Sequence, residues 1–153
     1  MESKLNHLAI IMDGNRRWAQ QRNLMSFSGH RAGAKTLTRI IQYCVNKKIK
    51  ELTVFAFSTE NWNRDPLEVQ NILKLFQEYI RSKIAIIKSK NINLNFLGEK
   101  ERFPKELISL MKLAENLTLN NNGLKLNVCL NYGGKQDIVK GTKCLLRKYM
   151  SGD

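Results

Sequence analysis

The sequence predicts an α/β protein built on an open, mostly parallel β-sheet with helices on both faces. Two observations lead to this fold class. Short apolar runs of strand length alternate four times with longer segments in which apolar residues recur at helical spacing. The segments between successive runs are long enough for the helical crossovers that parallel strands require. At 153 residues, we expect one domain that spans residues 1–153.

Two strand and helix units make up the first part of the chain. Residues 8–12 are all apolar, as in a parallel strand covered on both faces, and a short helix follows over residues 15–22. A second helix is expected to open at Gly29, and residues 52–57 form the second strand. The apolar positions of the second helix are Ala34, Leu37, Ile41, Cys44 and Val45.

The second part repeats the pattern. Asp65 as N-cap and Pro66 at the first helical position start a long helix that continues to about residue 90. Residues 91–97 form the third strand, a helix begins at Pro104, and residues 124–130 form the fourth strand. A final amphipathic helix uses Ile138, Thr142, Leu145, Leu146 and Tyr149.

The chain is strongly basic. Its net charge of +13 favours an anionic partner such as nucleic acid, a phosphorylated small molecule or an acidic membrane surface, without choosing among them. Asn, Lys and Ile are abundant throughout, so we interpret much of the excess as a compositional bias.

The cysteines and the apolar runs indicate the cellular compartment of the protein. Cys44, Cys129 and Cys144 lack metal-binding spacing and fall in apolar patterns, so we expect reduced core thiols and a cytoplasmic protein. The apolar runs are too short to cross a bilayer, so membrane contact would be peripheral, at the inner face.

Polar clusters follow three of the four predicted strands, at residues 13–18, 58–64 and 131–134. The carboxyl ends of parallel strands share one rim of the sheet, and ligands bind at that rim. We therefore expect the three clusters to converge on one site.

The first cluster reads Asp-Gly-Asn-Arg-Arg-Trp from Asp13. An Asp-Gly step alone is most often only a turn. However, Gly14 lets backbone approach a ligand, the helix start offers unpaired N–H groups, and Arg17 supplies a fork suited to phosphate oxygens. Asp13 fits such a site if Mg²⁺ lies between its carboxylate and a diphosphate. His30, at the start of a helix, could donate to the same phosphates.

The second cluster, Ser-Thr-Glu-Asn-Trp-Asn-Arg from Ser58, is longer than a connecting loop needs. A purely structural alternative is that Trp62 packs over the edge of the core while Ser58 and Thr59 satisfy backbone groups.

Four ordered segments, H-L-A-I-I-M-D-G-N-R-R-W-A, G-H-R-A-G, L-T-V-F-A-F-S-T-E-N-W-N-R and N-Y-G-G, closely resemble the cis-prenyltransferase family, the undecaprenyl diphosphate synthases. The resemblance implies a prenyl transferase that condenses an allylic diphosphate, typically farnesyl diphosphate, with successive isopentenyl diphosphates. The product is a cis-polyprenyl diphosphate, which serves in bacteria as the lipid carrier for cell-wall glycans. The resemblance also implies Mg²⁺ as cofactor, a homodimer, and a hydrophobic tunnel between the sheet and the helices.

The resemblance assigns roles to individual residues. Asp13 would hold Mg²⁺ and assist departure of the allylic diphosphate, and Asn61 would act in removal of the proton after carbon–carbon bond formation. Because an amide is a poor base, we expect Asn61 to orient the group that takes the proton. The expected substrate-binding residues are Gly14, Asn15, Arg16, Arg17, His30 and Arg64 around the phosphates, Trp18 and Trp62 beside the prenyl groups, and Ser58, Thr59 and Glu60 in the same pocket.

The sequence departs from the family pattern in three respects. The family's R-T-S/G-G-E type segment, which binds isopentenyl diphosphate, does not follow N-Y-G-G here, so we expect a C-terminally truncated member. Ser26 stands where the family usually has arginine, and Lys135 replaces the arginine after N-Y-G-G. One alternative is an inactive fragment or an allylic-diphosphate-binding partner subunit. The third alternative is a nucleic-acid-binding protein. No nucleic-acid partner is expected, because the sequence contains no recognisable nucleic-acid-binding motif.

Overall fold

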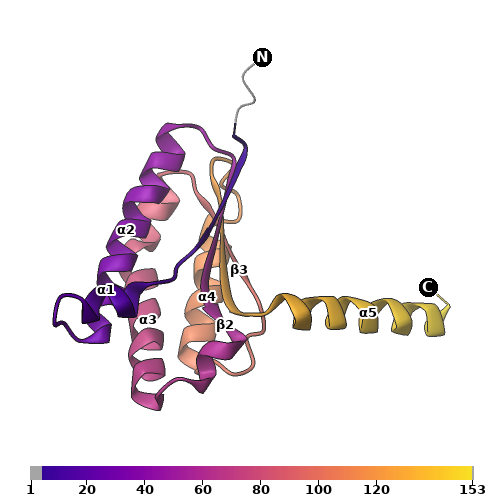
Figure 1. Ribbon diagram of the computed structural model, residues 1–153. Coiled ribbons are helices and arrows are strands. Elements are labelled where there is room, and N and C mark those ends of the chain that lie inside the picture. Colours follow the sequence, from indigo (N-terminus) through magenta and orange to yellow (C-terminus); the bar gives the residue numbers. More distant parts are fainter. Residues whose placement is uncertain (1–4, 153) are drawn as a thin grey trace.

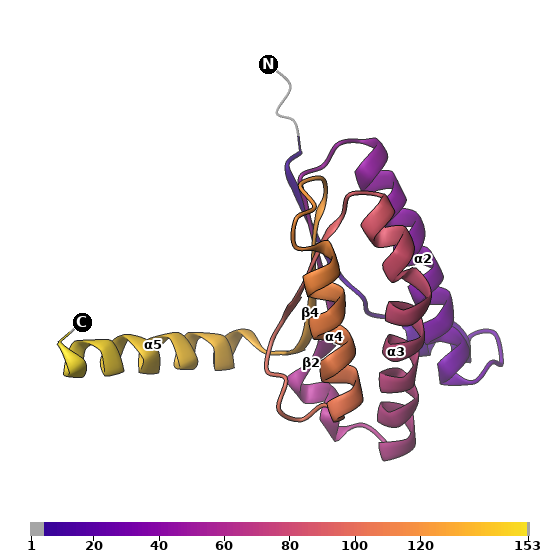
Figure 2. The same cartoon turned by 180° about the vertical axis from the view of Figure 1, so that it is seen from behind.

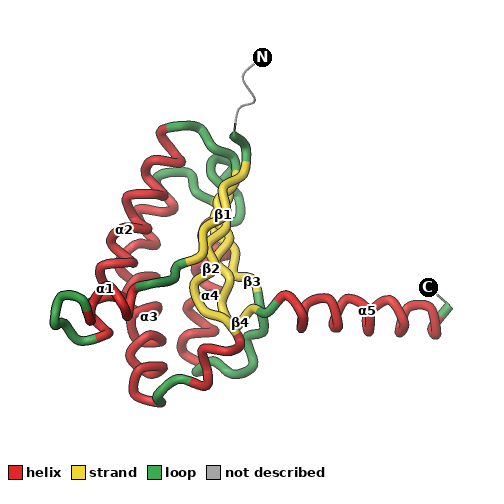
Figure 3. Tube along the Cα trace, viewed as in Figure 1, coloured by secondary structure: helices red, strands yellow, loops and turns green. Residues whose placement is uncertain are grey.

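The computed structural model describes residues 5–152, and in this part of the chain four parallel strands form one sheet in the order β1-β2-β4-β3 (Figures 1 and 3). The strands are β1 (His7–Ile11), β2 (Glu51–Ser58), β3 (Asn93–Leu97) and β4 (Lys125–Tyr132). Each corresponds to a predicted apolar run, so the open parallel α/β fold is confirmed.

The helices also follow the predicted order. They are α1 (Asn15–Gln20), α2 (Ser26–Asn46), the 3₁₀ turn η1 (Thr59–Asn63), α3 (Pro66–Ser89), α4 (Lys105–Thr118) and α5 (Gly134–Ser151). None of the helices in residues 5–152 is both long and apolar enough to cross a membrane. The start of α3 is as predicted, because the Asp65 carboxylate accepts hydrogen bonds from the N–H groups of Leu67 and Glu68 at 2.9 and 3.2 Å.

The start of α2 differs from the prediction. The helix begins at Ser26, three residues before Gly29, after an extended Met25. Gly29 is buried and serves a different purpose, since a Cβ there would lie 2.0 Å from the backbone oxygen of Asn15. The glycine therefore allows α1 to lie directly against α2 and does not mark the start of a helix.

The helices that pack on the sheet cover one face of it. Alternate residues of the strands, such as Leu52, Val54, Leu94 and Leu126, form one buried cluster with apolar residues of α2, α3 and α4. On the other face, Ile11 is 75% exposed. The last helix, α5, extends away from the sheet and has no buried residue (Figures 1 and 2). The expected helical cover on both faces is thus not found in residues 5–152.

Helix α4 also covers the outer edge of β3. The backbone N–H groups of Leu94 and Phe96 point away from β4 and donate to Thr118 Oγ1 at 3.2 Å and to Glu115 Oε1 at 2.8 Å. Thr118 in turn donates to the Ala114 carbonyl at 2.9 Å. This pairing satisfies backbone donors that an uncovered edge strand leaves open.

We predict that Thr118→Val lowers the free energy of unfolding by about 1–3 kcal/mol, because it leaves the buried Leu94 N–H without an acceptor while keeping the shape of the side chain. Chemical denaturation followed by circular dichroism measures this. Thr142→Val is the matched control, since Thr142 makes the same hydrogen bond to the carbonyl four residues earlier but is exposed on α5. Equal losses in the two variants would contradict the capping role.

The cysteines only partly match the prediction. Cys44 and Cys129 are buried, and burial raises the pKa of both thiols. Cys144 is exposed on α5, so the expectation of a core thiol is wrong at this position. Its apolar neighbours in sequence belong to a helix that does not pack on the core.

Candidate active site

An apolar cavity of about 620 Å³ lies between the sheet and the helices α2 and α3. Its walls come from β2, β4, α2 and α3, and include Ala56, Leu126, Val128, Leu130, Leu37, Ile41, Ile72, Phe76 and Ile80. This is the position that the resemblance implied for a hydrophobic tunnel. Because the same side chains belong to the core cluster, the cavity is a hollow in the core itself.

A bulge in β2 shapes the wall of this cavity. The pairing of β2 with β4 shifts register between Phe55 and Phe57, so Ala56 has no direct partner. With strict alternation, Phe57 would point to the opposite face from Val54, but both are buried in the same cluster. The bulge thus directs Ala56 and Phe57 together into the cavity wall.

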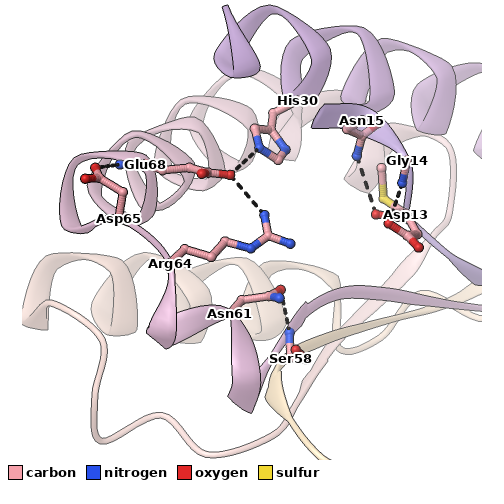
Figure 4. Close-up of polar contacts among 10 residues, drawn as sticks. Asp13, Gly14, Asn15, His30, Ser58, Asn61, Arg64, Asp65 and Glu68 are labelled. Carbon is pink, nitrogen blue, oxygen red and sulfur yellow. Dashed lines mark hydrogen bonds and ion pairs between the residues drawn. The ribbon is translucent and has the colours of Figure 1, made fainter. Parts of the chain in front are cut away.

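Polar residues from separate segments meet at one end of the cavity, at the carboxyl ends of the strands. They follow β1, begin α2 and follow β2 (Figure 4). The predicted site residues that line this mouth are Asp13, Gly14, Asn15, Arg16, Arg17, His30, Asn61 and Arg64. The third cluster contacts the second, because Asn131 Oδ1 accepts from Trp62 Nε1 at 2.8 Å, but none of residues 131–134 lines the cavity. Only two of the three predicted clusters therefore contribute to the mouth.

Asp13 and Gly14 form the turn between β1 and α1. Gly14 has a φ of 82°, in the left-handed region, and its N–H donates to Asp13 Oδ1 at 2.5 Å. Arg17 Nη2 lies 3.5 Å from Asp13 Oδ2, and both side chains are about three-quarters exposed. The carboxylate therefore keeps free lone pairs on the solvent side of the mouth.

His30, Glu68 and Arg64 form a second group at the mouth, and its central member, Glu68, was not predicted from the sequence. Glu68 Oε1 accepts from His30 Nε2 at 3.4 Å and from Arg64 Nη1 at 3.2 Å (Figure 4). Glu68 is largely buried, with 14% of its side chain exposed. It therefore holds two donors in fixed positions beside the cavity. The available signal was the four-residue spacing between Arg64, which lies just before α3, and Glu68 in the first turn of that helix.

The environment of His30 shifts its imidazole toward the neutral form. Burial lowers the pKa of His30, and the nearby Arg64 adds to this, while the Glu68 carboxylate acts in the opposite direction. Addition of a negative charge at the mouth would raise this pKa again.

The amide oxygen of Asn61 already accepts a hydrogen bond within the protein. Its Oδ1 accepts from the Ser58 N–H at 3.0 Å, which closes the η1 turn (Figure 4). An amide whose oxygen is used in this way presents its NH₂ group as a donor. This arrangement favours a role in orienting an anion over a role as a base.

A family model described as a putative undecaprenyl diphosphate synthase matches residues 11–152. The chain belongs to the undecaprenyl diphosphate synthase family. A relative from Legionella pneumophila (strain Paris), named ditrans,polycis-undecaprenyl-diphosphate synthase ((2E,6E)-farnesyl-diphosphate specific), is 44% identical over 153 residues. That match covers 99% of this chain and 64% of the relative. The relative of the same name from Escherichia coli (strain K12) is 41% identical, and the match covers 96% of this chain and 58% of the relative.

Solved structures give the same assignment. Lavandulyl diphosphate synthase from Lavandula x intermedia, in complex with dimethylallyl diphosphate, superposes with a TM-score of 0.94 at 32% identity. A probable undecaprenyl diphosphate synthase from Campylobacter jejuni superposes with a TM-score of 0.80 at 28% identity. These matches cover 97% and 96% of this chain, and 64% of each solved chain. The chain thus spans about three-fifths of the length of the synthases that it matches.

Five of the residues expected in the synthase pocket lie elsewhere among residues 5–152. Trp18, Ser58, Thr59, Glu60 and Trp62 are not among the residues that line the cavity. The Trp62 ring packs against Phe57 and Phe103, with centroids 5.1 and 5.5 Å apart. This is the structural alternative considered for this residue. Trp18 is 38% exposed, with the Arg22 guanidinium 4.4 Å from its ring centroid.

The two other departures from the synthase pattern also lie away from the cavity lining. Ser26 is the first residue of α2, and Lys135 is exposed at the start of α5. The cations that line the mouth are instead Arg16, Arg17 and Arg64.

Proposed function

We propose that this chain forms the allylic-substrate half of a cis-prenyltransferase, which condenses farnesyl diphosphate with isopentenyl diphosphates to an undecaprenyl-type diphosphate. The observation that carries the proposal is an apolar cavity of about 620 Å³ with a mouth of arginines, amide and imidazole donors and one carboxylate. An allylic diphosphate has the same division, since its prenyl tail is apolar and its head is anionic.

The diphosphate would bind at the mouth. The backbone N–H groups at the start of α1 and the guanidinium groups of Arg17 and Arg64 supply donors to its oxygens. His30 and the Asn61 NH₂ group lie on the same rim and can donate as well. The prenyl tail would then extend between α2 and α3, where its burial from water favours binding.

The reaction breaks the bond between C1 of the allylic substrate and its diphosphate, forms a carbon–carbon bond to isopentenyl diphosphate, and releases a proton. Arg17 and Arg64 would stabilise the negative charge that develops on the leaving diphosphate. Asn61 would orient the oxygen that takes the proton, because its own amide is not basic.

The mouth fits a Mg²⁺ ion that the protein and the diphosphate hold jointly. Residues 5–152 contain no cluster of three or more His, Cys, Asp or Glu side chains that could hold a metal. A single carboxylate with free lone pairs, as at Asp13, is sufficient for Mg²⁺, which commonly uses one or two carboxylates, substrate phosphates and water. When bound, the ion would neutralise charge on the departing diphosphate.

The direct test is incubation of the chain with farnesyl diphosphate, labelled isopentenyl diphosphate and Mg²⁺, followed by extraction of labelled lipid. Labelled polyprenyl diphosphate that is absent with Asp13→Ala supports transferase activity. Saturable binding of farnesyl diphosphate without product supports the second candidate, an allylic-diphosphate-binding protein without turnover. That candidate is supported by the same cavity and mouth, which fit the tail and the head of an allylic diphosphate. Absence of binding would contradict both.

We predict that binding of farnesyl diphosphate takes up a proton on His30, because the anion raises a pKa that burial holds low in the free protein. Affinity should therefore rise as the pH falls from about 8 to about 6, by at most about tenfold per pH unit. Calorimetry in two buffers with different ionisation enthalpies measures the uptake. His30→Gln is the control for titration of the substrate itself, and unchanged uptake in this variant would contradict the assignment.

Assembly and location complete the proposal. We propose a homodimer and a cytoplasmic protein that contacts the inner face of the membrane peripherally. An enzyme with a polyprenyl product must deliver a lipid that is poorly soluble in water.

A further inference from the structure

The positive charge of this chain is concentrated in two segments. Residues 31–50 contain six Lys or Arg residues and no Asp or Glu, and residues 79–92 contain four Lys or Arg residues and no Asp or Glu. Together these 34 residues carry a net +10 of the total +13. An even distribution would give them about +3, so a general compositional bias does not account for this concentration.

The fold brings the two segments together. The first covers most of α2 and the turn after it, and the second covers the C-terminal part of α3 and the turn after it. Both views of the ribbon place these helices side by side, on the side of the molecule away from α5 (Figures 1 and 2). We refer to the exposed side chains of residues 31–50 and 79–92 as the α2–α3 surface.

Helical spacing aligns the exposed residues of this surface. Lys35, Arg39 and Tyr43 of α2 and Lys47 at its C-cap are each four residues apart, and all are exposed. Residues at this spacing lie on one face of a helix. Tyr43 is 57% exposed with the Lys47 ammonium 5.8 Å from its ring centroid, and Ile86 on α3 is 46% exposed. The surface therefore combines cations with exposed apolar groups.

Within the described part of the chain, most of these cations have no carboxylate partner. Arg31 pairs with Glu78 and Arg81 pairs with Glu106. The ion pairs found within residues 5–152 include no partner for the other eight basic residues of the surface. The charge is thus available to an external anion.

The apolar cavity lies directly behind the surface. Arg39 and Gln42 of α2, with Lys83, Ile86 and Lys90 at the α3 end, line its outer side. The Lys90 ammonium contacts the Gln42 amide oxygen and so bridges the two elements. We propose that the α2–α3 surface docks on an anionic phospholipid bilayer, which places the side of the cavity away from Asp13 next to the membrane. This deepens the proposed function and rests on it, because a lengthening prenyl chain would then face lipid.

A bilayer explains the observations better than a nucleic acid does. Both would use the cations, but exposed Tyr43 and Ile86 beside an apolar cavity suit the boundary between headgroups and acyl chains, where tyrosine is enriched. Each Lys or Arg near an anionic leaflet strengthens binding by about fivefold, and added salt weakens it.

The test is co-sedimentation of the chain, without substrate, with phosphatidylcholine vesicles that contain or lack phosphatidylglycerol. We expect binding that requires phosphatidylglycerol and weakens with salt. The combined variant K35Q, K47Q, K48Q and K88Q should lose about 600-fold in affinity, at about fivefold for each charge removed. The control variant K105Q, K112Q, K143Q and K148Q removes the same charge from α4 and α5, and should bind as the native chain does.

Three outcomes would overturn the proposal: binding that does not depend on phosphatidylglycerol, equal loss in both combined variants, and unchanged binding in the first. Binding of a single-stranded RNA is measured in parallel to test the nucleic-acid alternative. A higher affinity for RNA than for vesicles, lost in the first combined variant, would also overturn the proposal. Tyr43→Ser should weaken binding to vesicles and leave binding to RNA unchanged. Farnesyl diphosphate binding in solution is measured separately, so failure of the proposed function is distinguished from failure to dock.

Discussion

Substitution of Asp13 with asparagine is expected to abolish the Mg²⁺-dependent part of farnesyl diphosphate binding. In the native chain, Mg²⁺ should tighten binding by about 100-fold, because the ion cancels repulsion between the carboxylate and the diphosphate and attracts both. The asparagine side chain has the same shape as aspartate but a much weaker affinity for the ion. Titration of fluorescent or labelled farnesyl diphosphate with Mg²⁺ or with a chelator measures the effect.

Without metal, the substitution should no longer weaken binding of the diphosphate. With a chelator present, Asp13→Asn should bind the diphosphate as well as the native chain or better, since a like charge has been removed. Asp65→Asn is the matched control, because it makes the same charge change at the start of α3 and keeps an N-cap acceptor. An equal loss of Mg²⁺ dependence in both variants would argue against a specific role for Asp13. The exposed Asp13–Arg17 pair should contribute little to stability.

Substitution of Gly29 with alanine is expected to destabilise the fold by about 3 kcal/mol and to weaken diphosphate binding. The added Cβ would lie 2.0 Å from the Asn15 backbone oxygen and 3.1 Å from the Ala19 side chain. The first clash is with backbone at the start of α1, which no side-chain rotation relieves. Helix α1 would have to move away from α2, and Arg17 would move with it.

Gly141→Ala supplies the control for this experiment. Gly141 also lies inside a helix, but a Cβ there would meet no atom within 4 Å. That variant should be as stable as the native chain or more stable by up to about 1 kcal/mol, because alanine has the higher helix propensity. Urea denaturation and farnesyl diphosphate titration of both variants are the measurements. A stable Gly29→Ala variant with native affinity would show that α1 need not lie against α2.

Much of the fold could be predicted because its signals are local. The unbroken apolar runs indicated the four strands, and the Asp65-Pro66 pair indicated the start of α3, confirmed by the hydrogen bonds of the Asp65 carboxylate. Long connections between the runs implied parallel strands. Convergence of the polar clusters then followed from topology, because the carboxyl ends of parallel strands share one rim. On this basis we expected Asp13 and Arg64 at one site, and we expected His30 there because of its place at the start of a helix.

Other features depend on contacts between segments far apart in the chain. The bulge at Ala56 follows from the pairing of β2 with β4, and no residue of β2 signals it alone. Glu68 became part of the site because α2 brings His30, 38 residues earlier in the chain, within 3.4 Å of its carboxylate. Trp62 lies in a polar cluster after a strand, where a substrate contact was expected, but its ring packs against Phe57 and Phe103.

By itself, the sequence determined the fold class, the family resemblance and the Asp13 to Arg17 turn, because these depend on residue order and short-range periodicity. Which side chains reach the cavity, which face of the sheet is covered and where the charge is concentrated all depend on tertiary packing. The reason is that packing sums contacts over distant segments: ten basic residues spread over two stretches of sequence become one surface only when α2 and α3 lie side by side.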